Sequence, residues 1–175
     1  FLGVRLACAQ CHDHPFADWT QEDFWGVAAF FAGARLQQQQ PGGETVGERR
    51  TQITQEGATY DLRFLWHTGE IDLGPDELPR RLFAEWLTSP ENPHFAATAV
   101  NRVWQYLCGR GLTGSVDDLD QATPQERELL DDLAGLFADS GFDLRWLIQG
   151  ICRSRYYQHA CEEDPEGLSS VAARP

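Results

Sequence analysis

The second half of the chain contains four segments in which apolar residues recur every three to four positions, as on one face of a helix. The residues that start or stop these segments are Pro90, Gly109 or Gly111, Pro124, Gly141 and Asp143. The residues expected to face a core are Leu78, Leu82, Trp86 and Leu87, then Ala96, Ala99, Val100, Val103 and Leu107, then Leu129, Leu130, Leu133 and Phe137, then Leu144, Leu147, Ile148 and Ile151. Because amphipathic helices with short connections bury their stripes against one another, residues 76–161 are predicted to form a small helical bundle.

The first 34 residues predict two further helices. One is short and covers 1–12, with Phe1, Leu2 and Leu6 as its apolar contacts. The other begins after Thr20, the expected N-cap, and runs to about residue 32, with Asp23 as the acid of a capping box. Its aromatic stripe is expected to be core, although it could also line a haem pocket. The stripe consists of Phe24, Val27, Ala28 and Phe31, with Trp25 and Phe30 alongside.

Residues 35–75 predict a flexible, Gln- and Gly-rich loop followed by a β-hairpin that turns at Glu56 and Gly57, with strands within 50–54 and 59–66. The chain is therefore expected to be mainly α, with a small hairpin inserted between a short N-terminal Cys-x-x-Cys-His helix and a helical domain. The predicted division is 1–34, 35–75, 76–161 and a polar tail at 162–175.

The charge balance excludes one class of partner. The 175 residues include 14 basic and 27 acidic side chains, a net charge of −13. A nucleic-acid-binding face needs clustered Lys and Arg, so none is expected, whereas a basic protein partner would be matched. No apolar run approaches the roughly 20 residues of a membrane span. The chain has no methionine and opens at Phe1 within an apolar run, so we expect it to lack an N-terminal part of a longer protein.

The motif Cys8-Ala9-Gln10-Cys11-His12 has the spacing of a covalent haem attachment site. On a helix, Cys8 and Cys11 would lie one turn apart on one face and reach the two vinyl groups of a porphyrin. His12 would then be the proximal iron ligand. The same residues also allow a Cys8–Cys11 disulfide, a zinc site that includes His14, or two buried thiols. The chain has three other cysteines: Cys108, Cys152 and Cys161. Cys108 and Cys152 are expected to be small core residues.

A ligand on the far side of the iron cannot be methionine from this chain, since it has none. His14 is too close in sequence to His12 to reach the opposite face. His67 is the best remaining candidate, ahead of His94 and His159, and a five-coordinate iron is equally possible.

A polar cluster in the second half could line a groove, but inter-helix ion pairs and helix caps are favoured for it. Its members are Asn101, Arg102, Arg110, Asp117, Asp118, Arg153 and Arg155. No catalytic triad, phosphate loop or carboxylate pair stands out in the sequence, so no reaction is predicted.

Several blocks in order resemble one family. They include residues 1–16, with Cys8 to Phe16 at their end, then 86–93, 100–104, 109–112, 141–144 and 154–158. Together they resemble the end of a planctomycete-type cytochrome c-like domain followed by the planctomycete-specific helical domain, a family of largely unknown function. One segment departs from that pattern: residues 120–126 replace an expected Asn-Pro-Pro-rich stretch ending in His-Pro.

The resemblance implies a periplasmic or otherwise extracytoplasmic protein and, through its cytochrome label, haem c. The first hypothesis is an electron-transfer segment that holds haem through Cys8, Cys11 and His12 and has an unidentified redox partner. The second is a non-catalytic structural or interaction module in which the same cluster holds zinc, forms a disulfide or is unliganded. A third, from family context alone, is an accessory domain of an extracellular degradative enzyme.

Overall fold

The computed structural model describes residues 1–36, 44–45, 49–67, 69 and 71–159. The chain divides into two compact units: a mixed unit of residues 5–89, and a helical unit of residues 1–4 and 90–175. The prediction of a mainly α fold with a small hairpin is confirmed. The four-part division into 1–34, 35–75, 76–161 and 162–175 stays a prediction, and its last part, with Cys161, lies outside the described residues.

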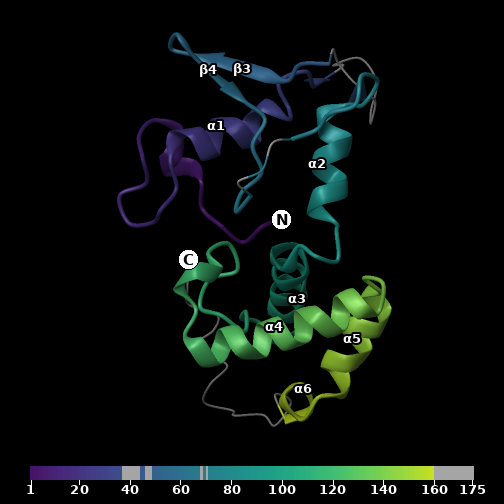
Figure 1. The fold of residues 1–175 in the computed structure, drawn as a ribbon. Helices are drawn as coiled ribbons and strands as arrows, with labels where there is room; N and C mark the ends of the chain where they lie inside the picture. The colour runs from purple at the N-terminus through teal and green to yellow at the C-terminus, as the bar shows by residue number, and fades with distance from the viewer. Residues whose placement is uncertain (37–43, 46–48, 68, 70, 160–175) are drawn as a thin grey trace. The chain divides into compact units, whose positions relative to one another are not determined.

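The mixed unit contains helix α1, Gln21–Ala29, and helix α2, Pro79–Leu87, after a short 3-10 helix η1 at Ala7–Gln10. Strands β3, Gln52–Gln55, and β4, Ala58–Asp61, form the predicted antiparallel hairpin, which packs beside α1 (Figure 1). The turn is at Glu56 and Gly57, both with positive φ, as a tight hairpin requires. Strands β1, Arg35–Leu36, and β2, Glu44–Thr45, form a second, shorter antiparallel pair that was not predicted.

Helix α1 begins as its sequence predicts. The Thr20 hydroxyl accepts a hydrogen bond from the Asp23 N–H, and the Asp23 carboxylate accepts from the Thr20 N–H at 2.9 Å, which completes a capping box. The helix ends at Ala29, three residues earlier than expected. The prediction of its buried stripe was wrong by one position, because the buried residues are Trp25, Gly26, Ala29 and Phe30.

The core of the mixed unit is aromatic. The Phe64 ring stacks on Phe30 and Trp86, with centroids 4.8 and 4.6 Å apart, and the Phe83 ring lies 5.1 Å from Phe30. Phe30, Phe64 and Phe83 are all buried. These rings pack against one another, so the preference for core over a haem pocket agrees with their packing.

The helical unit contains α3, Pro93–Cys108, α4, Pro124–Asp139, α5, Leu144–Arg153, α6, Arg155–His159, and a short 3-10 helix η2 at Leu119–Gln121. Of these elements, α6 and η2 were not predicted. The signals for the helix ends are confirmed: Gly109 closes α3 in the left-handed region, and Asp143 caps α5 by accepting from the Arg145 N–H at 2.8 Å. The segment that departs from the family pattern also has a local role, since Thr123 and Glu126 form the capping box of α4.

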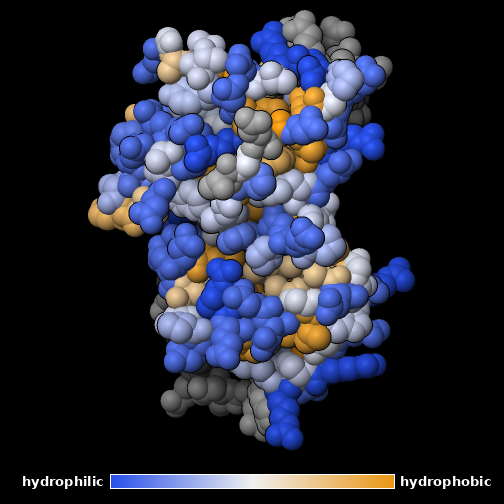
Figure 2. Space-filling model, viewed as in Figure 1, coloured by the Kyte–Doolittle hydropathy of each residue, from blue (hydrophilic) through white to orange (hydrophobic). Residues whose placement is uncertain are grey.

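The core of the helical unit forms where α3, α4 and α5 meet. Its buried members are Ala96, Ala97, Val100, Trp104, Leu119, Leu130, Ala134, Phe137, Leu147 and Ile151. Three residues predicted to face the core are instead exposed: Leu129, Leu144 and Ile148. Each lies at the edge of the apolar stripe of its helix, and that stripe is wider than the surface that the helix buries against its neighbours. Figure 2 shows apolar side chains among charged ones on the surface over α4 and α5.

The helix predicted over residues 1–12 is present only as η1. Gly3 adopts a φ of +65°, which no right-handed helix contains. Its carbonyl accepts a hydrogen bond from the Leu119 N–H at 2.8 Å. A Cβ at position 3 would lie 2.6 Å from Leu119 Cγ, so the close approach also requires glycine. This tertiary contact overrides the local helical pattern.

Two helical glycines predict a gain in stability. A Cβ added at Gly135 in α4 or at Gly150 in α5 would have no neighbour within 4 Å. Since alanine is favoured over glycine in a helix interior by about 1 kcal/mol, Gly135→Ala and Gly150→Ala should each raise the free energy of unfolding by about 0.5–1 kcal/mol. Urea denaturation followed by circular dichroism would measure it, and a loss of stability in both variants would contradict the open surroundings of these positions.

Candidate functional site

The Cys-x-x-Cys-His motif lies on and just after η1. Cys8 is within the 3-10 helix and Cys11 is its C-cap, with the Cys11 N–H donating to the Cys8 carbonyl at 3.5 Å. In a 3-10 helix, residues three apart lie above one another, so the two side chains share a side even without the predicted α-helix. Both cysteines are free and exposed, whereas Ala9 between them is fully buried. The thiols are therefore accessible and not joined to each other.

The imidazole of His12 is exposed and held in one tautomer. Its Nδ1 lies 2.7 Å from the backbone carbonyl oxygen of Asp13. Since a carbonyl oxygen only accepts, Nδ1 carries the proton, which leaves a lone pair on Nε2. A hydrogen bond from one ring nitrogen that frees the other is the usual arrangement of a metal-ligating histidine.

The backbone around the motif is fastened to α1. The Gln10 carbonyl accepts from the Trp25 indole Nε1 at 3.1 Å and from the Gln21 side-chain amide at 3.4 Å. The Asp13 carboxylate accepts from the Gln21 N–H, the first residue of α1, at 2.9 Å. These bonds fix the backbone on both sides of Cys11 and leave the thiols and His12 at the surface. The motif is therefore held against α1 with its two thiols and its imidazole at the surface.

His14 is arranged differently from His12. Its Nδ1 accepts a hydrogen bond from the Phe16 backbone N–H at 3.1 Å, and the backbone N–H of His14 donates to the Trp19 carbonyl at 2.7 Å. In that tautomer the proton is on Nε2, so neither ring nitrogen offers a free lone pair to a metal. Among the residues that the structure describes, no three His, Cys, Asp or Glu side chains converge as a metal site. Zinc bound here would require a local rearrangement.

His67 lines a cavity of about 760 Å³ that also includes Asp13, the neighbour of His12. The other carboxylates in its wall are Glu22 and Asp61, and its one guanidinium, Arg63, pairs with Glu22 at 2.9 Å and with Asp23 at 3.2 Å. This cavity is polar, so it offers no apolar slot for a porphyrin. Of the two cavities described for this protein, neither has Cys8, Cys11 or His12 in its wall.

The two other histidines considered as ligands lie in the helical unit. The side chain of His159, at the end of α6, lies outside the described part of the chain. His94 is half-buried in the first turn of α3, where burial, and then the charge of Arg127, lowers its pKa to about 4, opposed by Asp131. It is therefore neutral at physiological pH.

The neutral state of His94 predicts a pH dependence of stability. Between about pH 6.5 and pH 4, the unfolded chain binds a proton at His94 that the folded chain does not, so stability falls as pH falls through this range. His94→Gln should remove this part of the fall, as measured by urea denaturation at several pH values. Equal slopes in the wild type and the variant would contradict the prediction; His67→Gln, at an exposed histidine, is the control.

The polar cluster of the helical unit divides into separate structural roles. Asn101 is fully buried: its amide donates to Thr113 Oγ1 at 2.8 Å, and its carbonyl oxygen accepts from the Leu112 N–H at 2.7 Å. Arg102 forms an ion pair with Asp117. A hydrogen bond to Tyr156 raises the pKa of Arg110. The favoured interpretation was inter-helix ion pairs and helix caps; the contact of Arg102 with Asp117 is an ion pair, whereas Asn101 holds the loop after α3 and caps no helix.

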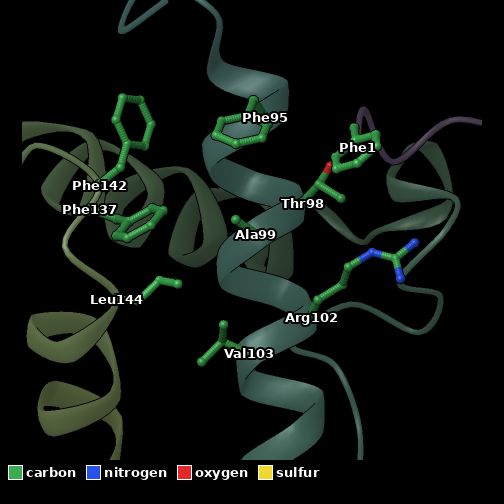
Figure 3. Close-up of a pocket in the computed structure, with 9 residues that line it drawn as sticks. All are labelled: Phe1, Phe95, Thr98, Ala99, Arg102, Val103, Phe137, Phe142 and Leu144. Atoms are coloured by element: carbon green, nitrogen blue, oxygen red, sulfur yellow. The ribbon is translucent and has the colours of Figure 1, made fainter. Parts of the chain in front are cut away.

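An apolar cavity in the helical unit was not predicted from the sequence (Figure 3). Its walls come from one face of α3 and from the connection between α4 and α5. Apolar periodicity identifies these residues as core but cannot show that space remains between them. Thr98, its one hydroxyl residue, carried no signal in the sequence because a single threonine within a helix is commonplace.

Comparison with protein families decides the assignment. The profile of PSD1, described as "Protein of unknown function (DUF1553)", matches residues 79–173, more than half of the chain. The chain belongs to the PSD1 family. A second profile, PSCyt2, described as "Protein of unknown function (DUF1549)", matches residues 1–36, which include the Cys-x-x-Cys-His motif. Both are planctomycete cytochrome c-like and associated domain families, so the resemblance seen in the sequence is confirmed.

In this PSD1 protein the family match begins at Pro79, the first residue of α2. Neither a curated protein nor a solved structure matches the chain. Across the described helices, none combines the length and apolar character that a bilayer crossing demands.

Proposed function

We propose that residues 8–12 are a covalent attachment site for haem c and that the chain is an electron-transfer segment. The observation that carries the proposal is the state of the three side chains. Cys8 and Cys11 have free, exposed thiols on one side of η1, and the adjacent His12 has its Nδ1 proton engaged and its Nε2 lone pair open. These are the groups that thioether attachment and iron ligation need.

Each residue has a separate task. The thiols of Cys8 and Cys11 would hold the porphyrin through two thioether bonds, each formed by addition of S–H across a vinyl group with no loss of atoms. His12 would bind the iron through Nε2, and the bond of its Nδ1 to the Asp13 carbonyl orients the ring. Trp25 and Gln21 hold the Gln10 carbonyl, so the attachment segment keeps its place on α1. When bound, haem supplies a one-electron redox centre.

The surroundings predict an open, low-potential centre. The chain has no methionine, so it cannot supply the His/Met ligation that raises the reduction potential of a haem. His67 stays a proposal for the distal position, although the polar cavity that it shares with Asp13 does not itself fit a porphyrin. The net charge of −13 favours a basic redox partner. An extracytoplasmic location is part of the same proposal, since the family resemblance and the haem motif both imply it.

The test is expression of the exported protein in a host that attaches haem c. Absorption spectra with and without dithionite should show a reducible Soret band, and the haem should stay with the chain in a denaturing gel. Cys8→Ala with Cys11→Ala should abolish the covalent haem. His12→Ala should change the spectrum. Cys108→Ala with Cys152→Ala, also free cysteines, is the matched control and should bind haem normally.

A colourless wild-type protein would overturn the proposal. It would favour the alternative of a structural or interaction module, which one observation supports. The hydrogen bonds from Trp25 and Gln21 to Gln10, and from Gln21 to Asp13, support this alternative because they hold the motif against α1. Metal analysis of that colourless protein would then show whether zinc is bound, and thiol counting would show whether Cys8 and Cys11 form a disulfide.

A further inference from the structure

The helical unit contains an open cavity of about 610 Å³ whose wall is almost wholly apolar. This volume is within the range of about 300–1,000 Å³ that is usual for small-molecule sites. The residues in its wall are Phe1, Phe95, Thr98, Ala99, Arg102, Val103, Phe137, Phe142 and Leu144. Figure 3 shows Phe137, Phe142 and Leu144 to one side of α3, and Phe1, Thr98 and Arg102 to the other.

One wall is a helix face, and the opposite wall comes from the end of α4, the connection to α5 and the start of α5. Phe95, Ala99, Arg102 and Val103 follow one another at helical spacing and present one face of α3. The opposite wall is anchored by Phe142, whose ring meets Phe95 and Phe137 edge-on at 5.7 and 5.5 Å between centroids. Because Phe137 is buried in the core of the unit, this wall is held in place.

One polar group in the wall has no partner. Thr98 is 2% exposed, and its Oγ1 is buried without a hydrogen bond to any of the residues that the structure describes. Such a hydroxyl usually finds a partner, because an unsatisfied buried group is costly. Figure 3 shows this oxygen directed toward Phe1, a residue that is 83% exposed. A ligand that displaces the Phe1 ring would reach the hydroxyl.

The one charged side chain in the wall, Arg102, is already paired. The guanidinium of Arg102 is paired with Asp117, and both side chains are more than half exposed. An anionic ligand would have to displace that carboxylate, whereas an uncharged ligand would contact only the aliphatic part of Arg102. The charge balance of the cavity therefore favours a neutral occupant.

We propose that this cavity binds a compact, uncharged, largely aromatic molecule with one hydrogen-bonding oxygen. The apolar walls take the ring system, and Thr98 bonds the oxygen. The occupant would also cover Leu144, which has a place in the apolar pattern of α5 and is nevertheless 53% exposed. The site uses no residue of the haem motif, so it stands or falls separately from haem attachment.

The test uses three probes with the same naphthalene rings. Naphthalene has no polar group, 1-naphthol has one hydroxyl and 1-naphthoate has one negative charge. Binding to the whole chain would be measured by equilibrium dialysis. The expected result is tightest binding of 1-naphthol, about tenfold tighter than naphthalene, because one hydrogen bond of about 1.4 kcal/mol corresponds to that factor.

Two kinds of variant locate the site. Thr98→Val replaces the hydroxyl with a methyl group of similar shape; it should weaken 1-naphthol about tenfold, leave naphthalene unchanged and not lower the melting temperature, since the lost hydroxyl has no partner. Ala99→Phe should fill the cavity and abolish binding of both probes. Val103→Phe serves the same purpose if Ala99→Phe does not fold by circular dichroism.

Three outcomes would overturn the proposal. One is the absence of binding by naphthalene and 1-naphthol alike. Another is tighter binding of 1-naphthoate than of 1-naphthol, which would make this an anion site at Arg102. The third is undiminished binding in a folded cavity-filling variant, which would place the probes elsewhere, for example on the exposed side chains of α4 and α5.

Discussion

Asn101→Ala is expected to lower the free energy of unfolding of the helical unit by about 3 kcal/mol. Asn101 is fully buried in α3 and holds the loop that follows that helix. Its carbonyl oxygen accepts from the N–H groups of Leu112 and Thr113, at 2.7 and 3.4 Å, and its amide donates to the Thr113 hydroxyl and the Ser115 carbonyl. Alanine would leave the N–H groups of Leu112 and Thr113 without their acceptor, each at a cost of about 1–3 kcal/mol, while the Thr113 hydroxyl would keep its bond to the Ser115 carbonyl at 2.8 Å.

Urea denaturation followed by circular dichroism would measure this loss, with Gln105→Ala as the control. Gln105 is exposed one turn further along α3, so its variant should stay within about 0.5 kcal/mol of the wild type. Asn101→Leu separates hydrogen bonding from volume, since leucine fills the space but cannot bond the loop. If leucine restored wild-type stability, the bonds would not be the reason Asn101 matters.

The same loop explains two glycines in the block that resembles the family. Gly109 has a φ of +81°, which ends α3. A Cβ at Gly111 would lie 2.8 Å from Asn101 Oδ1 and 2.9 Å from the Thr113 carbonyl oxygen. The first glycine could be predicted from local signals, because the stop of a helix is a local event. The second depends on a side chain ten residues earlier in the sequence, and no local pattern shows it.

This contrast holds for the whole fold. Helix starts were predicted well where a cap and its partner are three residues apart, as with Thr20 and Asp23. The burial of individual stripe residues was predicted less well, because it depends on how wide a contact each helix makes. Leu129, Leu144 and Ile148 fit the apolar period and are exposed, whereas Trp25 and Phe30 lie in the core beside the predicted stripe.

The candidate haem site follows the same rule. Sequence spacing was enough to select Cys8, Cys11 and His12 as one group. It could not show the tautomer of His12, which depends on the Asp13 carbonyl, or the bond from Trp25 that fastens Gln10. From spacing alone, His14 was as good a candidate zinc ligand as His12, although its Nδ1 accepts a hydrogen bond from the Phe16 N–H.

Gly26→Ala should destabilise the mixed unit by about 2 kcal/mol, although alanine is the better helix former by about 1 kcal/mol. A Cβ at Gly26 would lie 2.4 Å from Arg63 Cβ and 3.3 Å from the Arg63 nitrogen. Because these atoms belong to or adjoin the backbone, α1 and the segment after β4 would have to separate. That movement would also stretch the bond from the Arg63 N–H to the Gly26 carbonyl, now 3.2 Å.

A double-mutant cycle isolates this contact from everything else that Arg63 does. Arg63→Gly removes the Cβ that the new methyl group meets, along with the ion pairs to Glu22 and Asp23. In that background Gly26→Ala should be neutral or stabilising, so the coupling between the two sites should be about 2–3 kcal/mol, measured by urea denaturation. A Gly26→Ala protein that gained stability, as predicted for Gly150→Ala, would mean that the two backbones do not meet closely. The hairpin would then be free to move on α1, the helix to which the Cys-x-x-Cys-His motif is fastened.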